Sequence, residues 1–157
     1  MTGPSTRQAK GRSSGLPLNA LVPYQINRLS FRMNQRLGKA LLKHGMTIAT
    51  WRIMSALDEH DPATVTQLAK AAMIEQSTLS RALQRLEAKG YVSREFDPNQ
   101  RHVRRISLTS NGREALEEVR ELTWQHVDRI LRGFTEVEEH QLRSMLERMQ
   151  WNVEQTL

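Results

Sequence analysis

The stretch from Glu75 to Thr109 restricts the possible folds of this chain most, because it combines a short amphipathic helix with a pair of strands. Between residues 76 and 89, apolar side chains recur at three- and four-residue steps, which predicts a helix with one buried side. Lys89-Gly90 ends this helix with a cation in the last turn and a residue that readily adopts the left-handed conformation. The apolar positions are Leu79, Ala82, Leu83 and Leu86.

The opposite side of this helix carries hydroxyls, an amide and two guanidiniums, and no carboxylate comes before Glu87. A helix face that only meets solvent usually mixes acids with bases. Arg, Gln and Ser are side chains that hydrogen-bond base edges and phosphates in a DNA major groove. The face therefore predicts a DNA-reading helix, with candidate contacts Ser77, Thr78, Ser80, Arg81, Gln84 and Arg85.

Two runs with strand periodicity follow the helix, at residues 91–96 and 103–108, and Asp97-Pro98-Asn99-Gln100 forms the predicted turn between them. A helix followed by a basic hairpin predicts a winged helix-turn-helix. The alternative is a helix-hairpin element within some other α+β domain. The tip and return strand carry an exposed basic ribbon made of Arg101, His102, Arg104 and Arg105.

A second short helix precedes the reading helix and completes the predicted helix-turn-helix pair. Thr64 and Gln67 have the spacing of a capping box, in which two side chains satisfy backbone groups at a helix start. The residues that follow are small and apolar, which permits close packing against the helix at 76–89. The start of this helix adds the candidate DNA contacts Thr64, Thr66 and Gln67.

Helical patterns at both ends of the chain flank this centre, so the predicted fold is mainly α with a small β-hairpin wing. One long helix is expected from Thr109 or Ser110 to about Phe134, and Thr135 with Glu138 begins the last helix. The terminal helices carry apolar faces that one small domain cannot cover, which favours a homodimer; an intramolecular three-helix bundle is the alternative. The expected parts are a disordered basic tail (1–18), a first dimerisation helix (19–46), a winged helix-turn-helix lobe (47–109) and C-terminal dimerisation helices (110–157).

Composition narrows the classes of function further. The formal net charge of +6 points to polyanionic partners, and the absence of cysteine excludes disulfides, thiolate catalysis and thiol-based redox sensing. The five histidines lack the paired spacing of a metal site, and no glycine-rich phosphate loop is present. We therefore expect no enzyme, no cofactor and no metal. Neither a signal peptide nor an apolar run of ~20 residues occurs, so we expect a cytoplasmic protein without a membrane partner.

These elements, in this order, resemble the multiple antibiotic resistance regulator (MarR) family over roughly residues 20–155. The resemblance is strongest in Ser77-Thr78-Leu79-Ser80-Arg81 and in the run from Leu86 to Arg94. It continues through Asp97-Pro98-Asn99, Ile106-Ser107-Leu108-Thr109 and Gly112-Arg113, and Trp51-Arg52-Ile53-Met54 is similar to the start of the second helix of the family.

The resemblance implies a homodimeric regulator, usually a repressor, that binds a pseudo-palindromic operator in double-stranded DNA. In the family, Asp-x-Arg usually stands at the wing tip, with the Arg in a minor groove. Gln100 and His102 occupy those places in this chain, and Arg101 lies one residue earlier. The negative potential of a minor groove attracts a permanent cation most strongly. Arg101 is therefore the preferred wing-tip contact, and His102 is the alternative.

The resemblance also implies an effector site where the first, second and fifth helices meet the reading lobe. Aromatic rings with one or two guanidiniums suit a planar carboxylate, so a small aromatic acid, a phenolic compound or an acyl thioester is the expected effector. The alternatives are that Phe31 and Trp51 are core residues, and that the protein is an effector-independent architectural DNA binder or a regulator controlled by a protein partner. The candidate ligand-binding residues are Tyr24, Arg28, Phe31, Arg32 and Trp51.

Overall fold

The chain folds into helices around one small antiparallel sheet, and the computed structural model describes residues 17–97 and 103–155. Its elements in chain order are η1 (Leu18–Ala20), α1 (Val22–Leu42), α2 (Ile48–Glu59), β1 (Ala63–Thr64), α3 (Val65–Ala72), α4 (Gln76–Ala88), β2 (Val92–Phe96), β3 (Arg104–Leu108), α5 (Ser110–Glu117), α6 (Arg120–Ile130) and α7 (Glu136–Gln155).

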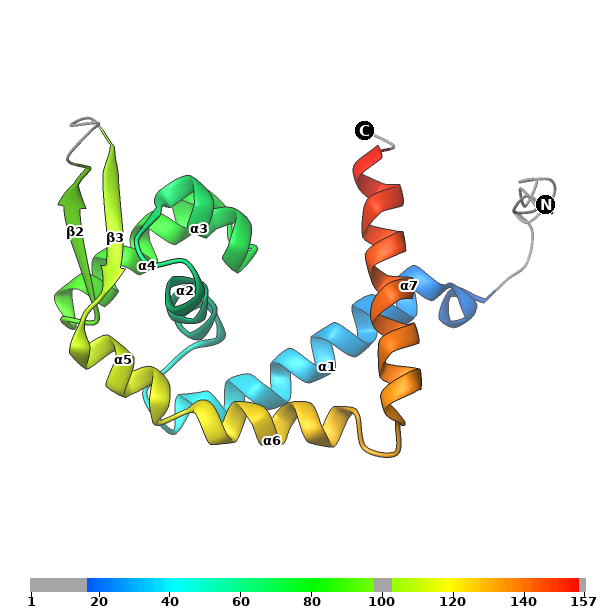
Figure 1. Cartoon of the computed structure of the whole chain (residues 1–157). Coiled ribbons are helices and arrows are strands. Elements are labelled where there is room, and N and C mark those ends of the chain that lie inside the picture. The colour runs from blue at the N-terminus through cyan, green and yellow to red at the C-terminus, as the bar shows by residue number, and fades with distance from the viewer. Residues whose placement is uncertain (1–16, 98–102, 156–157) are drawn as a thin grey trace.

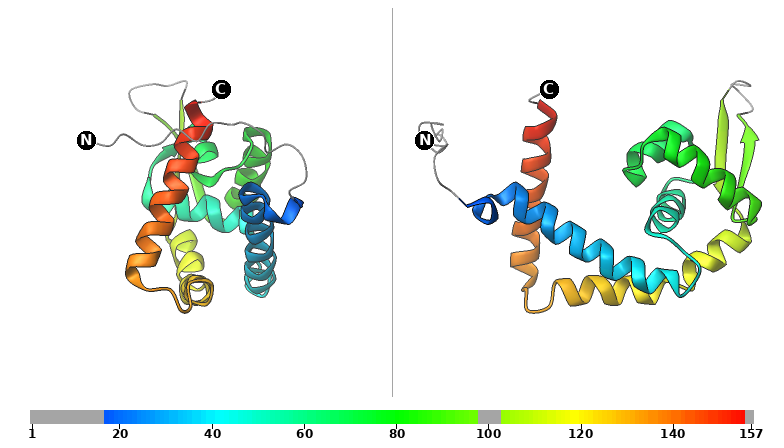
Figure 2. Two further views of the ribbon diagram at one scale, coloured as in Figure 1. Left: turned by 90° about the vertical axis from the view of Figure 1, so that its right-hand side faces the viewer. Right: turned by 180° about the vertical axis from the view of Figure 1, so that it is seen from behind.

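The molecule consists of a reading lobe at one end and a helical arm that leads away from it (Figure 1). The reading lobe contains α2, α3, α4 and the sheet. In the arm, α1 and α6 run side by side, and α7 turns away from them at the far end (Figures 1 and 2). The mainly α fold with a small β wing that the sequence predicted is confirmed.

Side-chain caps and one left-handed residue define the helix-turn-helix pair. The Thr64 hydroxyl accepts a hydrogen bond from the Gln67 N–H at 3.3 Å, and the Gln67 side chain accepts one from the Thr64 N–H at 2.9 Å. This is the predicted capping box. Met73 ends α3 at φ 52°, so the chain turns sharply before α4. Gly90, at φ 71°, turns the chain from α4 toward β2, also as predicted.

The sheet has three strands in the order β1-β3-β2, one more than the predicted hairpin. β1 pairs antiparallel with β3, with Ala63 opposite Ile106 and Thr64 opposite Arg105. The two predicted hairpin strands are present as β2 and β3, each one residue shorter at its start than expected. β1 therefore ties the segment before α3 to the base of the wing.

The core lies inside the reading lobe and continues into the arm. Its fully buried side chains come from α1, α2, α3, α4, β3 and the segment after α5. Val119 belongs to this core, so packing of the reading lobe extends beyond the expected domain boundary at residue 109. The largest fully buried side chains are Leu41, Ile53, Met54, Leu57, Leu68, Leu79, Leu83, Ile106 and Val119.

The single long helix expected from residue 109 or 110 to 134 is wrong, because the structure divides it into α5 and α6. Val119 lies between them at φ −103° and ψ 0°, and its N–H donates to the Leu116 carbonyl at 3.2 Å rather than to the carbonyl four residues back. The break turns Leu116 and Val119 toward the reading-lobe core while α6 continues along α1. Tertiary packing therefore overrides a helical period that no Gly or Pro interrupts between residues 113 and 132.

The far end of the arm exposes much apolar surface. α1 begins at Val22, later than the expected start near Asn19, and η1 precedes it; most of the predicted tail lies outside the described residues. Within residues 17–97 and 103–155, no helix is long and apolar enough to cross a membrane. The exposed large apolar side chains of α1 and α7 include Val22, Ile26, Leu29, Phe31, Val137, Leu142, Met145, Leu146, Trp151 and Val153.

Candidate nucleic-acid interface

The polar face of α4 lies outward because Leu79, Leu83 and Leu86 are buried on its other side. Neither Arg81 nor Arg85 forms an ion pair with any residue that the structure describes. Both guanidiniums are therefore available to an external polyanion. The structure brings the six candidates of this helix together on one exposed surface: Ser77, Thr78, Ser80, Arg81, Gln84 and Arg85.

A carboxylate that the sequence interpretation did not use stands at the N-terminal end of this face. Glu75 caps α4 and accepts hydrogen bonds from the Ser77 N–H at 3.0 Å and the Thr78 N–H at 3.2 Å. It also accepts one from the Ser77 hydroxyl. The hydrogen bond from that hydroxyl, followed by those from the two backbone N–H groups, lowers the pKa of Glu75 below its ordinary value. The Ser77 hydroxyl is thus already engaged. Glu is not one of the residues preferred as an N-cap, so the sequence alone did not reveal this role.

Two of the three candidates at the start of α3 cap the helix, and the third, Thr66, takes no part in the cap. Thr64 and Gln67 use their side chains to cap each other, so their first role is to hold the start of α3. Thr66 is exposed, and the Gln76 amide lies 3.5 Å from its hydroxyl. This hydrogen bond connects the start of α3 to the start of α4 on the outer side of the lobe.

The arginines of the wing differ in how they are held. Arg94 lies with its Nε 3.1 Å from Glu87 of α4, and Arg105 forms an ion pair with Asp97, a buried carboxylate. Arg105, predicted as part of the basic ribbon, thus has its charge paired with Asp97, while its side chain is 40% exposed. Arg104 is exposed, and its guanidinium carbon lies 5.1 Å from the centre of the Phe96 ring. Arg101 and His102, the candidate wing-tip contacts, lie outside the described residues.

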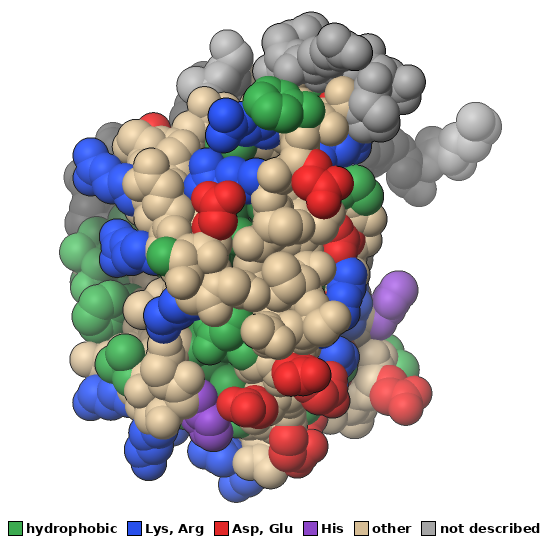
Figure 3. Space-filling model, turned by 90° about the vertical axis from the view of Figure 1, so that its left-hand side faces the viewer, with side chains coloured by type: hydrophobic (Ala, Val, Ile, Leu, Met, Phe, Trp, Pro, Cys, Tyr) green, Lys and Arg blue, Asp and Glu red, His purple; other side chains and the backbone are tan. Residues whose placement is uncertain are grey.

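Figure 3 shows the face of the molecule that carries the wing. Asp and Glu side chains gather most densely in its lower right part, whereas Lys and Arg side chains are spread along its left edge and its bottom as well as near its top, where an exposed hydrophobic side chain lies beside them. The densest acidic cluster therefore lies away from the top of this face, where Lys and Arg side chains are available to a polyanion.

The predicted ligand-binding residues do not surround one cavity. A groove of about 810 Å³ runs between α1 and α6, and Arg32 lines it. A smaller cavity of about 300 Å³ lies between α2, α5 and α6, and Trp51 lines that one. Tyr24, Arg28 and Phe31 line neither, and Phe31 is 67% exposed on α1.

The smaller cavity combines aromatic walls with one guanidinium and two carboxylates, those of Asp58 and Glu59. Trp51 of α2 and Trp124 of α6 line it together with Arg120 and His126. Burial lowers the pKa of His126, and the neighbouring guanidiniums of Arg129 and Arg36 lower it further. Sequence interpretation missed the α6 residues because a single continuous helix from 110 to 134 gave no reason to turn them toward α2.

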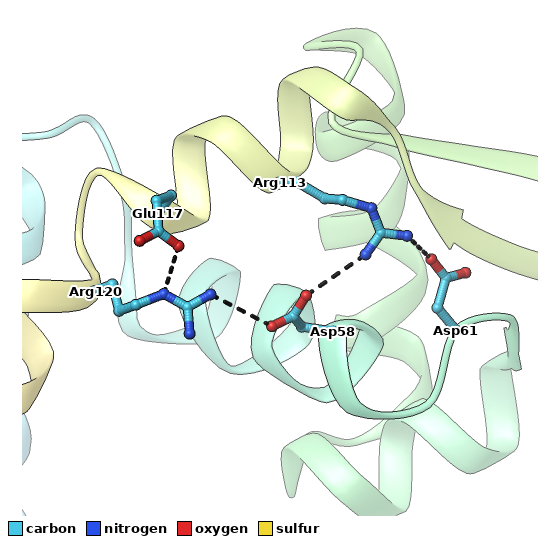
Figure 4. A network of polar contacts seen from close by, with 5 residues as sticks. All are labelled: Asp58, Asp61, Arg113, Glu117 and Arg120. Carbon is cyan, nitrogen blue, oxygen red and sulfur yellow. Dashed lines mark hydrogen bonds and ion pairs between the residues drawn. The ribbon is translucent and has the colours of Figure 1, made fainter.

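A network of ion pairs joins α2 to both sides of the α5–α6 break (Figure 4). Asp58 lies 3.5 Å from Nη1 of Arg113 and 3.8 Å from Nη2 of Arg120. Arg113 also pairs with Asp61, and Arg120 with Glu117. These side chains are partly exposed, so each pair contributes little to stability. The network nevertheless connects the reading lobe to the arm at the point where the smaller cavity lies.

Comparisons with known proteins agree with this arrangement. A model described as MarR family matches residues 44–101. The curated HTH-type transcriptional repressor IacR of Pseudomonas putida is 25% identical over 131 residues, which cover 83% of this chain and 78% of that protein. Bordetella bronchiseptica BpsR, whose DNA binding is regulated by 6-hydroxynicotinic acid, is 21% identical in sequence. Its structure superposes with a TM-score of 0.79 over 87% of this chain and 97% of that one.

A transcriptional regulator of the MarR family from Silicibacter pomeroyi is more similar in sequence. Its crystal structure superposes with a TM-score of 0.79 at 33% identity, over 87% of this chain and 92% of that one. The superposition covers most of both chains, so the likeness is not limited to the reading lobe. The chain therefore belongs to the MarR family of transcriptional regulators.

Proposed function

We propose that this chain is a homodimeric repressor that binds a pseudo-palindromic DNA site and leaves it when a small aromatic acid binds. The observation that carries the proposal is the outer face of α4, where Arg81 and Arg85 are exposed and unpaired among the described residues. Family membership makes the chain a regulator rather than an enzyme. The proposed location is the cytoplasm, where operator DNA would be its partner.

The proposed reading mode places α4 in a major groove. Arg81 and Gln84 are side chains that can pair bidentately with guanine and adenine, respectively. Arg104 on the wing contacts the DNA beside the site that α4 reads. A contact from Arg101 or His102 at the wing tip stays a prediction. A two-fold dimer presents two α4 helices about one DNA turn apart, which requires a pseudo-palindrome.

The exposed apolar surface of the arm supports a dimer of two identical chains. In the single chain, solvent reaches large apolar side chains on both terminal helices. They are Val22, Ile26 and Leu29 on α1, and Leu142 and Leu146 on α7. Apolar patches of this extent on a soluble regulator mark an interaction surface. In the proposed dimer, the arm of a second chain covers this surface.

The cavity between Trp51 and Trp124 is the proposed effector site, and a planar aromatic carboxylate is the proposed ligand class. Two indole rings provide apolar walls, and Arg120 provides a charge for the carboxylate. A carboxylate there competes with Asp58 for Arg120, which would loosen the connection between α2 and α6. The regulation of BpsR by 6-hydroxynicotinic acid, a carboxylic acid, supports this class of ligand. An alternative effector site lies on α1 and would be formed by the predicted residues Tyr24, Arg28, Phe31 and Arg32.

Arg81→Ala tests the DNA-reading role. Operator fragments are first selected from genomic DNA with the wild-type protein, and binding is then measured by fluorescence anisotropy. We expect a loss of about 1–3 kcal/mol at the operator and a smaller loss on random duplex, because a base contact adds specificity. Arg132→Ala removes the same charge from the exposed turn after α6 and should bind like wild type. Equal losses of binding free energy on both duplexes would show that Arg81 contacts only phosphate.

Thermal unfolding with aromatic acids tests the effector site. Benzoate and 6-hydroxynicotinate should raise the Tm of the wild type and weaken operator binding, whereas benzamide should do neither, because a ligand that binds the folded state stabilises it. Trp124→Ala removes one wall of the cavity and should abolish both effects. If Phe31→Ala abolishes them and Trp124→Ala does not, the site lies on α1. If no acid acts on the wild type, an effector-independent DNA binder is favoured.

A further inference from the structure

Phe96 occupies an unusual position for a large apolar side chain. β2 and β3 pair so that Val92 faces Leu108, Arg94 faces Ile106 and Phe96 faces Arg104. Directly opposite residues share one face of a sheet, and the first of these pairs is buried in the core. The third pair extends beyond the core, and Phe96 is 61% exposed. Burial therefore does not explain an aromatic residue here.

The contact that Phe96 makes is with the guanidinium of Arg104. The guanidinium carbon lies 5.1 Å from the ring centre, within the distance of about 6 Å at which a cation is attracted to an aromatic face. Arg104 forms no ion pair within the parts of the chain that the structure describes, and Glu95 lies on the opposite face of β2. Phe96 is thus the group that holds Arg104 in place.

An aromatic ring holds an arginine differently from a carboxylate. Asp97 pairs with Arg105 through both charge and a hydrogen bond from Nε, and Glu87 pairs with the charge of Arg94, so both guanidiniums have part of their charge balanced within the protein. The ring of Phe96 restrains Arg104 without removing its charge and without occupying its N–H donors. Arg104 therefore remains charged, exposed and partly ordered before any partner arrives.

We propose that Phe96 is a positioning residue that orients Arg104 for contact with a DNA phosphate beside the wing. The inference rests on the proposed DNA binding and extends it to a residue outside the predicted contact set. A contact to phosphate carries no base information, so the pair strengthens binding to operator and random DNA alike. Restraint by the ring reduces the side-chain freedom that Arg104 loses when it binds.

The experiment measures binding of full-length variants to the selected operator and to a random duplex of equal length, at several salt concentrations. Arg104→Ala should weaken binding to both duplexes by the same factor and lower the salt slope by about one, because one phosphate contact is lost. Phe96→Leu should weaken both by about two- to fivefold, and Phe96→Tyr should restore wild-type affinity. The variant that carries both Phe96→Leu and Arg104→Ala should bind no more weakly than Arg104→Ala. Thermal unfolding should give the same Tm for all of them, since both side chains are exposed.

Each other outcome overturns the proposal. If Phe96→Leu binds like wild type, Arg104 does not depend on the ring. If Phe96→Leu weakens binding by the same factor in the Arg104→Ala background, the ring acts independently of Arg104. If Phe96→Tyr is as weak as Phe96→Leu, the aromatic face is not what matters. A wild-type protein without affinity for either duplex overturns the proposed DNA binding itself, which separates that failure from the others.

Discussion

Gly112 lies against the backbone that precedes β2. A Cβ added at this residue would stand 2.1 Å from the Tyr91 carbonyl oxygen and 3.1 Å from the Leu108 side chain. The same carbonyl accepts a hydrogen bond from the Thr109 N–H at 3.1 Å, so it cannot move without loss. We predict that Gly112→Ala lowers the free energy of unfolding by about 1–3 kcal/mol through overpacking, measured by urea denaturation.

Gly38→Ala is the matched control, since it also adds one methyl group to a helix. Its Cβ would meet only the flexible end of Ile48 at 3.3 Å. Alanine also favours the helix over glycine by about 0.5–1 kcal/mol, so the two effects should nearly cancel. Gly112→Ala with a stability equal to that of wild type would show that the connection between β3 and α5 is able to shift.

At the scale of single residues, the sequence predicted the reading face of α4 better than the wing. Leu79 and Leu83 mark the buried side so clearly that Arg81 and Arg85 had to point outward. The ion pair between Arg105 and Asp97 was not predicted, because Asp97 reads as a turn residue and only the folded hairpin brings the two together across eight residues. Pairings of this kind depend on register, which composition does not reveal.

Among the helices, α4 depends on an ionised cap. Because the folded pKa of Glu75 is below its ordinary value of 4.5, its stabilising effect is fully present above that value and is lost as the pH falls through the lower folded pKa. We predict that Glu75→Gln has a lower Tm than wild type at pH 7 and that this difference disappears as the pH falls below 4.5 and through the folded pKa. Glu95→Gln, at an exposed strand position, should show no such dependence. A difference that stays constant with pH would contradict an ionic cap.

The elements that the sequence did not predict are those decided by distant contacts. β1 has two residues, too few for an alternating pattern, and it forms only because β3 lies beside it about forty residues later. The break between α5 and α6 follows from the burial of Val119 and from the pairing of Arg113 and Arg120 with Asp58. By contrast, α4 was predicted within one residue of its observed bounds, and the start of α7 at the cap formed by Thr135 and Glu138 was also predicted.

For the whole molecule, the central prediction is assembly through the arm. Leu146→Asp on α7 places a charge within the proposed apolar contact, where an unpaired charge is costly. We expect light scattering to find a dimer for the wild type and a monomer or unfolded chain for Leu146→Asp. Ser144→Asp adds the same charge on the opposite side of α7 and should leave the dimer intact. A monodisperse wild-type monomer at micromolar concentration would refute the proposed assembly.

The two-residue strand β1 also affects how separate molecules behave toward one another. A strand at the border of a sheet offers unpaired backbone groups to any other chain, and such borders promote aggregation. β1 covers β3 opposite Ile106 and Arg105, which leaves β2 as the long border strand among the described residues. Arg94 and Glu95 stand in the middle of β2, and charges there discourage a second wing from adding to the sheet. The wing can therefore project from the protein and meet its partner without also becoming a site where copies of the protein join edge to edge.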